Sequence, residues 1–162
     1  MLVRDGDNHL ELAVSERATS PHDAGDTRFT VRVRVDGLFA AFTAESLCWV
    51  DLRALATFAE QLRELEVRRQ GSAVLESMSP GELRLEVRST DRAGHMAAVG
   101  QVGWWLGVGS GEPYWSAVAF RVPFCPTELP ALVREFIALA VAPDAEPVAA
   151  ADGGGMSAFP GS

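Results

Sequence analysis

The chain has 162 residues, 48% of them apolar and 22% charged, with arginine as its only long basic residue and a formal net charge of −8. This composition excludes wholesale disorder and fits one globular domain that needs no metal or disulfide to fold. The N-terminus lacks a signal peptide's apolar region, and the densest apolar stretch, residues 96–108, is interrupted by Gln101 and three glycines. We therefore expect a soluble cytoplasmic protein with no membrane segment, in which Cys48 and Cys125 are free thiols.

The first half of the chain predicts strands followed by a helix. Residues 9–14 alternate weakly and suggest a first strand, which a polar connector follows. Strict alternation of apolar residues with arginine and threonine predicts a half-buried strand over 28–35, and an Asp-Gly turn leads to a hairpin partner at 38–44. Asp51 is a suitable N-cap for an amphipathic helix, because leucines recur at helical spacing up to Leu65.

The second half repeats this order. Four stretches have strand-like patterns: residues 71–76, 82–89, 95–106 and 114–124. The third is apolar on both faces and predicts a central strand in which glycines permit bulges or close backbone approach. Thr127 is expected to cap a last helix that continues to about Ala140, with Pro130 in its first turn. The Ala-, Pro- and Gly-rich residues 142–162 predict a disordered tail.

The predicted element order is βββα-ββββα. Short connections favour antiparallel pairing, so we expect an α+β fold with a curved, mainly antiparallel sheet of about six to seven strands and both helices packed on one side. Residues 1–141 form the single predicted domain, within which residues 1–27 give the least regular pattern.

The turn at residues 91–95 is one candidate site. Asp91, Arg92 and His95 place an acid, a base and an imidazole together, and loops on rigid scaffolds often carry function. The alternative is an ordinary turn made by Asp91 and Gly94 with a solvated arginine. The histidines show no metal-ligand spacing, and the glycines of 100–111 spell no phosphate loop. We expect no metal, no cofactor and no catalytic constellation.

The Ser-Pro-Gly turn is a second candidate. Glu76 and Glu82 flank it, and Ser79 lies in it without the Gly-x-Ser-x-Gly pattern of a serine nucleophile. Trp104 and Trp105 must face opposite sides of a regular strand, so one of them needs cover from a loop or another chain. The candidate binding residues are Glu76, Ser79, Glu82, Asp91, Arg92, His95 and Trp105.

Arginines on two predicted strands suggest a platform for an anionic partner. They share one exposed face if both strands lie in one sheet: Arg28, Arg32, Arg34, Arg84 and Arg88. Glu82 and Glu86 lie on the same face, however, and cross-strand Arg/Glu pairs keep a sheet soluble. Nucleic-acid binding is not expected, because the domain has no net positive charge.

Three motifs carry a resemblance to a known family. Residues 75–83 (LESMSPGEL), 91–95 (DRAGH) and 126–130 (PTELP) resemble those of an uncharacterised family common in high-GC bacteria. The chain is more distantly similar to the WapI-type immunity proteins, which protect a cell from a polymorphic toxin. The resemblance covers about residues 28–140 and brings no catalytic residues with it.

These observations predict a non-enzymatic protein-binding module, of an immunity type, whose partner is a toxin or a second copy of the chain in a homodimer. The alternative is a small-molecule-binding or hydrolytic domain that uses Glu76, Arg92 and His95 around a pocket floored by a tryptophan.

Overall fold

The computed structural model describes residues 1–20, 22–37, 39–106 and 114–141. The predicted tail at 142–162 lies outside these residues, as do residues 107–111 of the glycine run. In chain order the elements are β1 (Leu2–Asp5), β2 (Asn8–Arg17), β3 (Thr27–Asp36), β4 (Ala41–Val50), α1 (Leu52–Arg68), β5 (Ser72–Glu76), β6 (Leu83–Ser89), β7 (Met96–Leu106), β8 (Tyr114–Phe124), a 3-10 turn η1 (Pro126–Glu128) and α2 (Leu129–Leu139). None of the helices in the described parts is long and apolar enough to cross a membrane.

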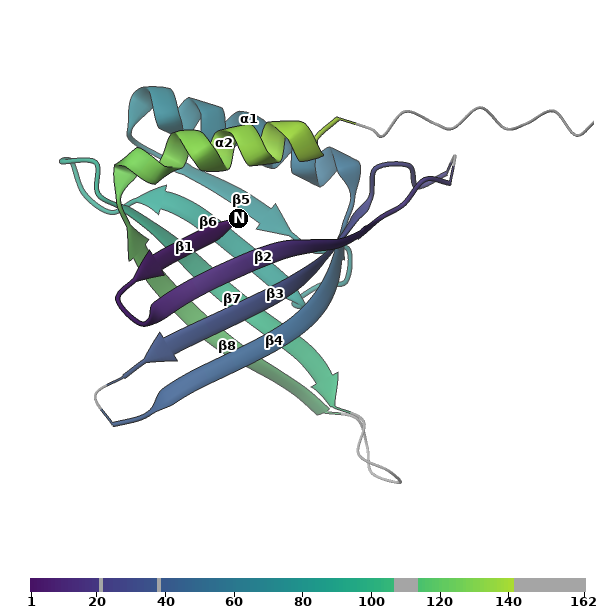
Figure 1. Ribbon diagram of the computed structural model, residues 1–162, viewed down its shortest axis with the longest axis horizontal. Coiled ribbons are helices and arrows are strands. Elements are labelled where there is room, and N and C mark those ends of the chain that lie inside the picture. The colour runs from purple at the N-terminus through teal and green to yellow at the C-terminus, as the bar shows by residue number, and fades with distance from the viewer. Residues whose placement is uncertain (21, 38, 107–113, 142–162) are drawn as a thin grey trace, which may run out of the picture.

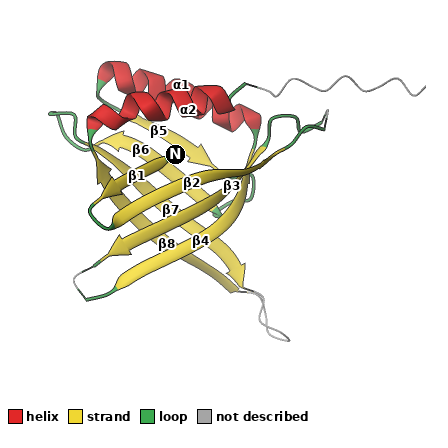
Figure 2. Cartoon of the chain, viewed as in Figure 1, coloured by secondary structure: helices red, strands yellow, loops and turns green. Residues whose placement is uncertain are grey.

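The strands form two four-stranded antiparallel sheets, with orders β1-β2-β3-β4 and β5-β6-β7-β8. Figures 1 and 2 show the sheets crossing face to face, with α1 and α2 lying side by side over one end of the space between them. The α+β class is confirmed, but the single curved sheet of six to seven strands was wrong. After β4 the chain crosses through α1 and starts a second sheet, and β4 and β5 never pair.

One strand was missed altogether. β1 pairs with β2 from Leu2–Glu11 to Asp5–Asn8, across a turn in which Gly6 has a φ of 59°. Four residues are too short a run for alternation to be recognised, and only Val3 of this strand is buried. Its pairing partner, rather than its own pattern, defines it as a strand.

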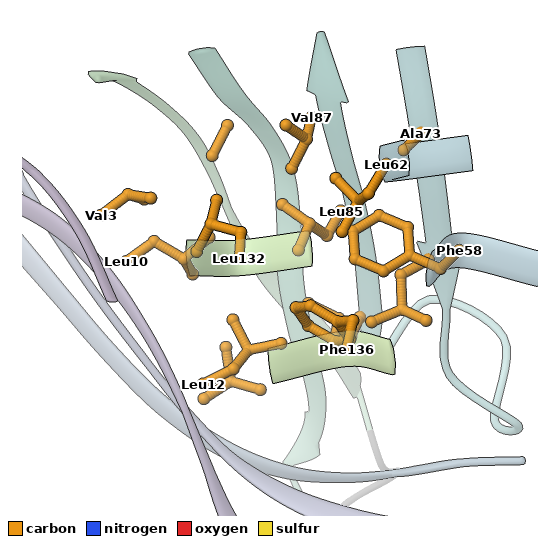
Figure 3. Packing of buried hydrophobic residues seen from close by; sticks show 14 of the residues in the cluster. Val3, Leu10, Leu12, Phe58, Leu62, Ala73, Leu85, Val87, Leu132 and Phe136 are labelled. Atoms are coloured by element: carbon orange, nitrogen blue, oxygen red, sulfur yellow. The ribbon is translucent and has the colours of Figure 1, made fainter. Parts of the chain in front are cut away.

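One apolar core lies between the two sheets and the helices. α1 buries Leu55, Phe58, Ala59, Leu62 and Leu65, which recur at helical spacing on one face. In Figure 3, Phe58 meets Phe136 of α2 edge to face, with ring centroids 4.7 Å apart and an interplanar angle of 86°. Leu10 and Leu12 of one sheet and Leu85 and Val87 of the other surround this pair, so the helices join the sheets into a single unit.

The two helices begin differently. Asp51 caps α1 as predicted, because its carboxylate accepts a hydrogen bond from the Ala54 amide at 2.8 Å. The prediction that Thr127 caps the last helix was wrong: Thr127 lies inside η1, and its hydroxyl donates to Cys125 Sγ at 3.0 Å. Since η1 runs directly into α2, the cap position falls on Glu128, which makes no side-chain capping bond.

Candidate functional site at the β5–β6 hairpin

The LESMSPGEL stretch spans the end of β5, a loop at residues 77–82 and the start of β6. Its conformation is fixed from within by Ser77. The Ser77 hydroxyl donates to the carbonyl of Ser79 at 2.7 Å and accepts from the amide of Leu83 at 2.9 Å. Gly81 has a φ of 89°, a conformation that glycine adopts without strain. Ser77 therefore holds the loop, and Ser79 contributes its backbone.

The loop is also fixed to the other sheet. The Met78 amide donates to the carbonyl of Trp49, near the end of β4, at 2.7 Å. The Met78 side chain is 54% exposed here. The loop thus bridges the two sheets and carries apolar surface where it does so.

A pair of tryptophans lies next to Gly81 of the loop. The Trp115 ring packs on two glycines: a Cβ at Gly103 would lie 2.1 Å from Trp115 Cζ2, and one at Gly81 would lie 3.0 Å from the same atom. Trp105, the cross-strand partner of Trp115, packs edge to face on it with centroids 5.4 Å apart and is 64% exposed. Trp104 points to the other side of β7 and is partly buried.

A small pocket opens beside these rings. It has a volume of about 210 Å³ and is lined by Glu76, Ser77, Pro80, Gly81, Leu83, Arg84 and Gln101. Glu76 Oε1 accepts from Arg84 Nε at 3.0 Å across the β5–β6 pair, and both side chains are solvent-accessible. We call the exposed part of this arrangement the hairpin surface: Glu76, Met78, Gln101, Trp105 and Trp115.

Two further pockets extend the hairpin surface towards the start of α1. One of about 360 Å³ shares Glu76 with the first, and one of about 440 Å³ shares Asp51 and Arg53 with the second. Together the three form what we call the acidic groove, whose charged lining is Asp23, Asp26, Asp51, Glu76, Arg53 and Arg84. Carboxylates outnumber guanidinium groups four to two in this lining, so the groove favours a cationic ligand.

Glu82 lies at the inner end of the loop and is half-buried. Burial raises the pKa of the Cys48 thiol to about 12, and the nearby Glu82 carboxylate adds to this effect by disfavouring a second negative charge. Cys48 is therefore a protonated core thiol at neutral pH. The effect of Glu82 that the structure shows is on the buried Cys48 thiol. Glu82 lines none of the three pockets of the groove.

The second predicted cluster lies at the far end of the same strand pair. Asp91 accepts from the His95 amide at 3.2 Å and contacts the His95 ring through its other oxygen, which lowers the pKa of Asp91. Arg92 is exposed in the same turn. The pairing of Ser72 with Arg88 and of Glu76 with Arg84 puts this turn and Glu76 at opposite ends of the pair. The structure therefore does not gather Glu76, Arg92 and His95 around one pocket.

No tryptophan lines any of the five pockets formed by the described residues, so the expected tryptophan-floored pocket is not among them. One of about 460 Å³ beside His95 is lined by residues that include Arg4, Arg121 and the exposed Cys125, and Glu76 is not among them. A larger, mainly apolar one of about 600 Å³ lies between β1, β2 and α2 and contains none of the predicted site residues. In the parts of the chain that are described, no three acidic, histidine or cysteine side chains are placed to hold a metal ion.

The arginine platform does not form. The arginines of β3 and those of β6 belong to different sheets, so the shared face expected for a single sheet does not exist. Each of the five has a carboxylate partner; the ion pairs are Arg28–Glu16, Arg32–Glu11, Arg32–Glu45, Arg34–Asp36, Arg84–Glu76 and Arg88–Glu86. These faces are solvated strands with cross-strand pairing.

Sequence reasoning placed Glu76, Ser79, Glu82 and Trp105 near the site but missed the residues that hold it together. Met78 was not singled out, and the packing of the Trp115 ring on the loop was not expected, because these contacts join segments far apart in the chain. The one available signal was Gly103, since a glycine inside a strand often marks close approach by another group.

Comparison with known proteins supplies the family. A family model described as the immunity protein WapI-like family matches residues 1–139. No curated protein and no solved structure matches the chain. The resemblance inferred from the motifs is confirmed and extends to the N-terminal strands. The chain belongs to the WapI-like immunity protein family.

Proposed function

We propose that this protein is a non-enzymatic immunity protein that binds a toxin directly and thereby neutralises it. The observation that carries the proposal is the family match over residues 1–139, which spans both sheets and both helices. An immunity function implies a protein partner, and a toxin is the partner that such a family would have.

The chemistry of the candidate groups supports binding. The Ser77 hydroxyl is engaged by the loop that it holds, and the Asp91–His95 contact closes its own turn. The hairpin surface, by contrast, combines exposed aromatic and apolar side chains with a polar pocket, which is the composition of a protein-binding site. A hydrolytic or small-molecule site built from Glu76, Arg92 and His95 is not proposed, because these residues lie at opposite ends of one hairpin.

The proposed site of action is the cytoplasm. Cys48 and Cys125 are both free thiols. Free thiols, one of them exposed, suit a reducing compartment.

Co-expression tests the proposal. The probe is the toxic domain encoded immediately upstream of this gene, expressed alone and with this protein. We expect growth to be restored and a stable complex to elute from a sizing column. An immunity protein from an unrelated gene pair serves as the control and should not restore growth. Unchanged killing and no complex, repeated for several such gene pairs, would refute the function.

A further inference from the structure

We propose that the hairpin surface is the docking site for the toxin and that its pocket receives a basic side chain of the toxin beside Glu76. The inference rests on the proposed function and adds to it the position of the interface and the chemistry of the partner. Trp105 and Met78 supply the apolar contact, and the acidic groove supplies the attraction for positive charge.

The apolar part has the character of a binding hot spot. Met78 and Trp105 are each more than half exposed; Met78 lies in the loop, and Trp105 packs on Trp115, whose ring lies against Gly81 of the same loop. Single exposed apolar residues are normal on a protein surface, whereas two at one ordered loop beside a polar pocket offer a contact for a partner. Tryptophan is the most enriched residue type at hot spots, and Trp115 holds the Trp105 ring from one side.

The surface is formed before any partner arrives. Ser77 closes the loop, the Met78 amide bonds to β4, and the Trp115 ring lies on Gly81 and Gly103. A site that is already ordered loses little conformational entropy on binding. The partner therefore meets a fixed shape, and interface residues can be tested singly without rearranging the loop.

The pocket is suited to one side chain. Its volume of about 210 Å³ is below the roughly 300–1,000 Å³ of sites for drug-sized ligands. Within the described chain, the Glu76 carboxylate is bonded only through Oε1, to Arg84. Oε2 and the neighbouring Gln101 amide oxygen are acceptors for an incoming guanidinium or ammonium group. Asp23, Asp26 and Asp51 along the groove add longer-range attraction.

The same charges argue against the other occupants of such a surface. A second copy of the chain would bring an identical acidic groove against this one, so like charges disfavour the pairing of two hairpin surfaces. A nucleic acid is repelled for the same reason. A toxin domain with a basic patch next to an apolar one satisfies both halves of the surface.

Two variants with matched controls test the docking site in a titration against the upstream-encoded toxin domain. Trp105→Ala removes the apolar contact; its control is Phe42→Ala, an aromatic residue 59% exposed near the start of β4. Glu76→Arg reverses the charge of a side chain that is 63% exposed and paired with Arg84. Its control is Glu60→Arg on α1, where the Glu60 side chain is 64% exposed and paired with Arg63. We expect at least about 30-fold weaker binding for Trp105→Ala and about 10-fold for Glu76→Arg, and less than about 3-fold change for either control.

The results separate the two proposals. If the unmodified protein binds the toxin and both hairpin variants bind equally well, the docking site is wrong while the immunity function stands. If the unmodified protein forms a dimer in solution that Trp105→Ala dissociates, the surface serves self-association and the docking proposal is overturned. If no toxin binding occurs at all, the proposed function fails. Recognition of a basic side chain by the pocket is then tested separately, without the toxin.

That test follows the indole Nε1–H signals by NMR while N-acetyl-arginine methylamide is added. The signals are assigned from single Trp→Phe variants. We expect the Trp105 and Trp115 signals to shift and the Trp104 signal to stay, with no shift when the neutral citrulline analogue replaces arginine. Equal shifts with both compounds, or no shift with arginine, would refute the recognition of a basic side chain.

Discussion

Replacing Gly103 with alanine should destabilise the whole domain through the hairpin surface. The new Cβ would lie 2.1 Å from Trp115 Cζ2 and 2.8 Å from the carbonyl oxygen of Gly81. Carbon atoms in ordinary contact lie roughly 3.5–4.0 Å apart. The Trp115 ring must therefore move by more than about 1 Å to make room for the new methyl group. Gly103 cannot withdraw, because its amide donates to the Glu82 carbonyl at 3.0 Å.

The expected cost is about 2–3 kcal/mol, the upper part of the range for inserting one methyl group into a packed site. For a domain of this size it corresponds to a melting temperature lower by about 5–10 °C. Gly37→Ala is the matched control, since among the described residues its Cβ would meet the Ala40 carbonyl oxygen alone, at 3.3 Å. We expect it to change the free energy of unfolding by less than about 0.5 kcal/mol.

Urea unfolding of a double-mutant cycle measures the cause of the cost. In a Trp115→Ala background the closest contact is gone and only the 2.8 Å approach to Gly81 remains. The penalty for Gly103→Ala should therefore fall by about 1 kcal/mol or more. An identical penalty with and without the Trp115 ring would refute the packing of that ring on Gly103.

Three more outcomes follow from the core, the first helix and the thiols. Phe136→Ala should lower the free energy of unfolding in urea by about 3–5 kcal/mol, because it removes a fully buried ring that packs on Phe58; a loss below 1 kcal/mol would contradict this packing. Asp51→Ala should cost about 1 kcal/mol in the same assay through loss of the α1 cap, and Asp51→Asn should recover most of it. A thiol reagent should label Cys125 alone in the native protein, since Cys48 is buried and its pKa is about 12, and both thiols after unfolding; two rapidly labelled native thiols would contradict the buried position.

The fold could be predicted as far as local patterns reach. Alternation over residues 28–35 and 82–89 correctly indicated strands with one buried face, because burial on one side imposes a period of two. The pattern does not say what covers that face. Each sheet here is covered by the other sheet as well as by the helices, and the same alternation is compatible with one sheet under two helices. Whether β4 pairs with β5 depends on the crossover through α1, which leaves no trace in either strand.

The candidate site likewise has features set by local sequence and features set by contacts between distant segments. The Ser-Pro-Gly sequence indicates a turn, and the positive φ of Gly81 that such a turn favours is set within four residues. The bond from Met78 to Trp49 and the packing of Trp115 on Gly103 join segments that are distant in sequence and have no periodic signal. The turn in the loop could therefore be predicted from the sequence. The contact by which the loop bridges the two sheets could not.

The requirements of folding account for Trp115 but not for Trp105. The Trp115 ring fills the space above two glycines, so the loop, β7 and β8 depend on it. Trp105 contacts that ring with one edge and leaves 64% of its surface in water, and a smaller residue would leave Trp115 in place. A large aromatic group exposed on a rigid support gains its free energy only when a partner covers it. Stability and binding should therefore separate at this surface: Trp105→Ala should unfold like the unmodified protein yet lose the toxin, and Gly103→Ala should lose both.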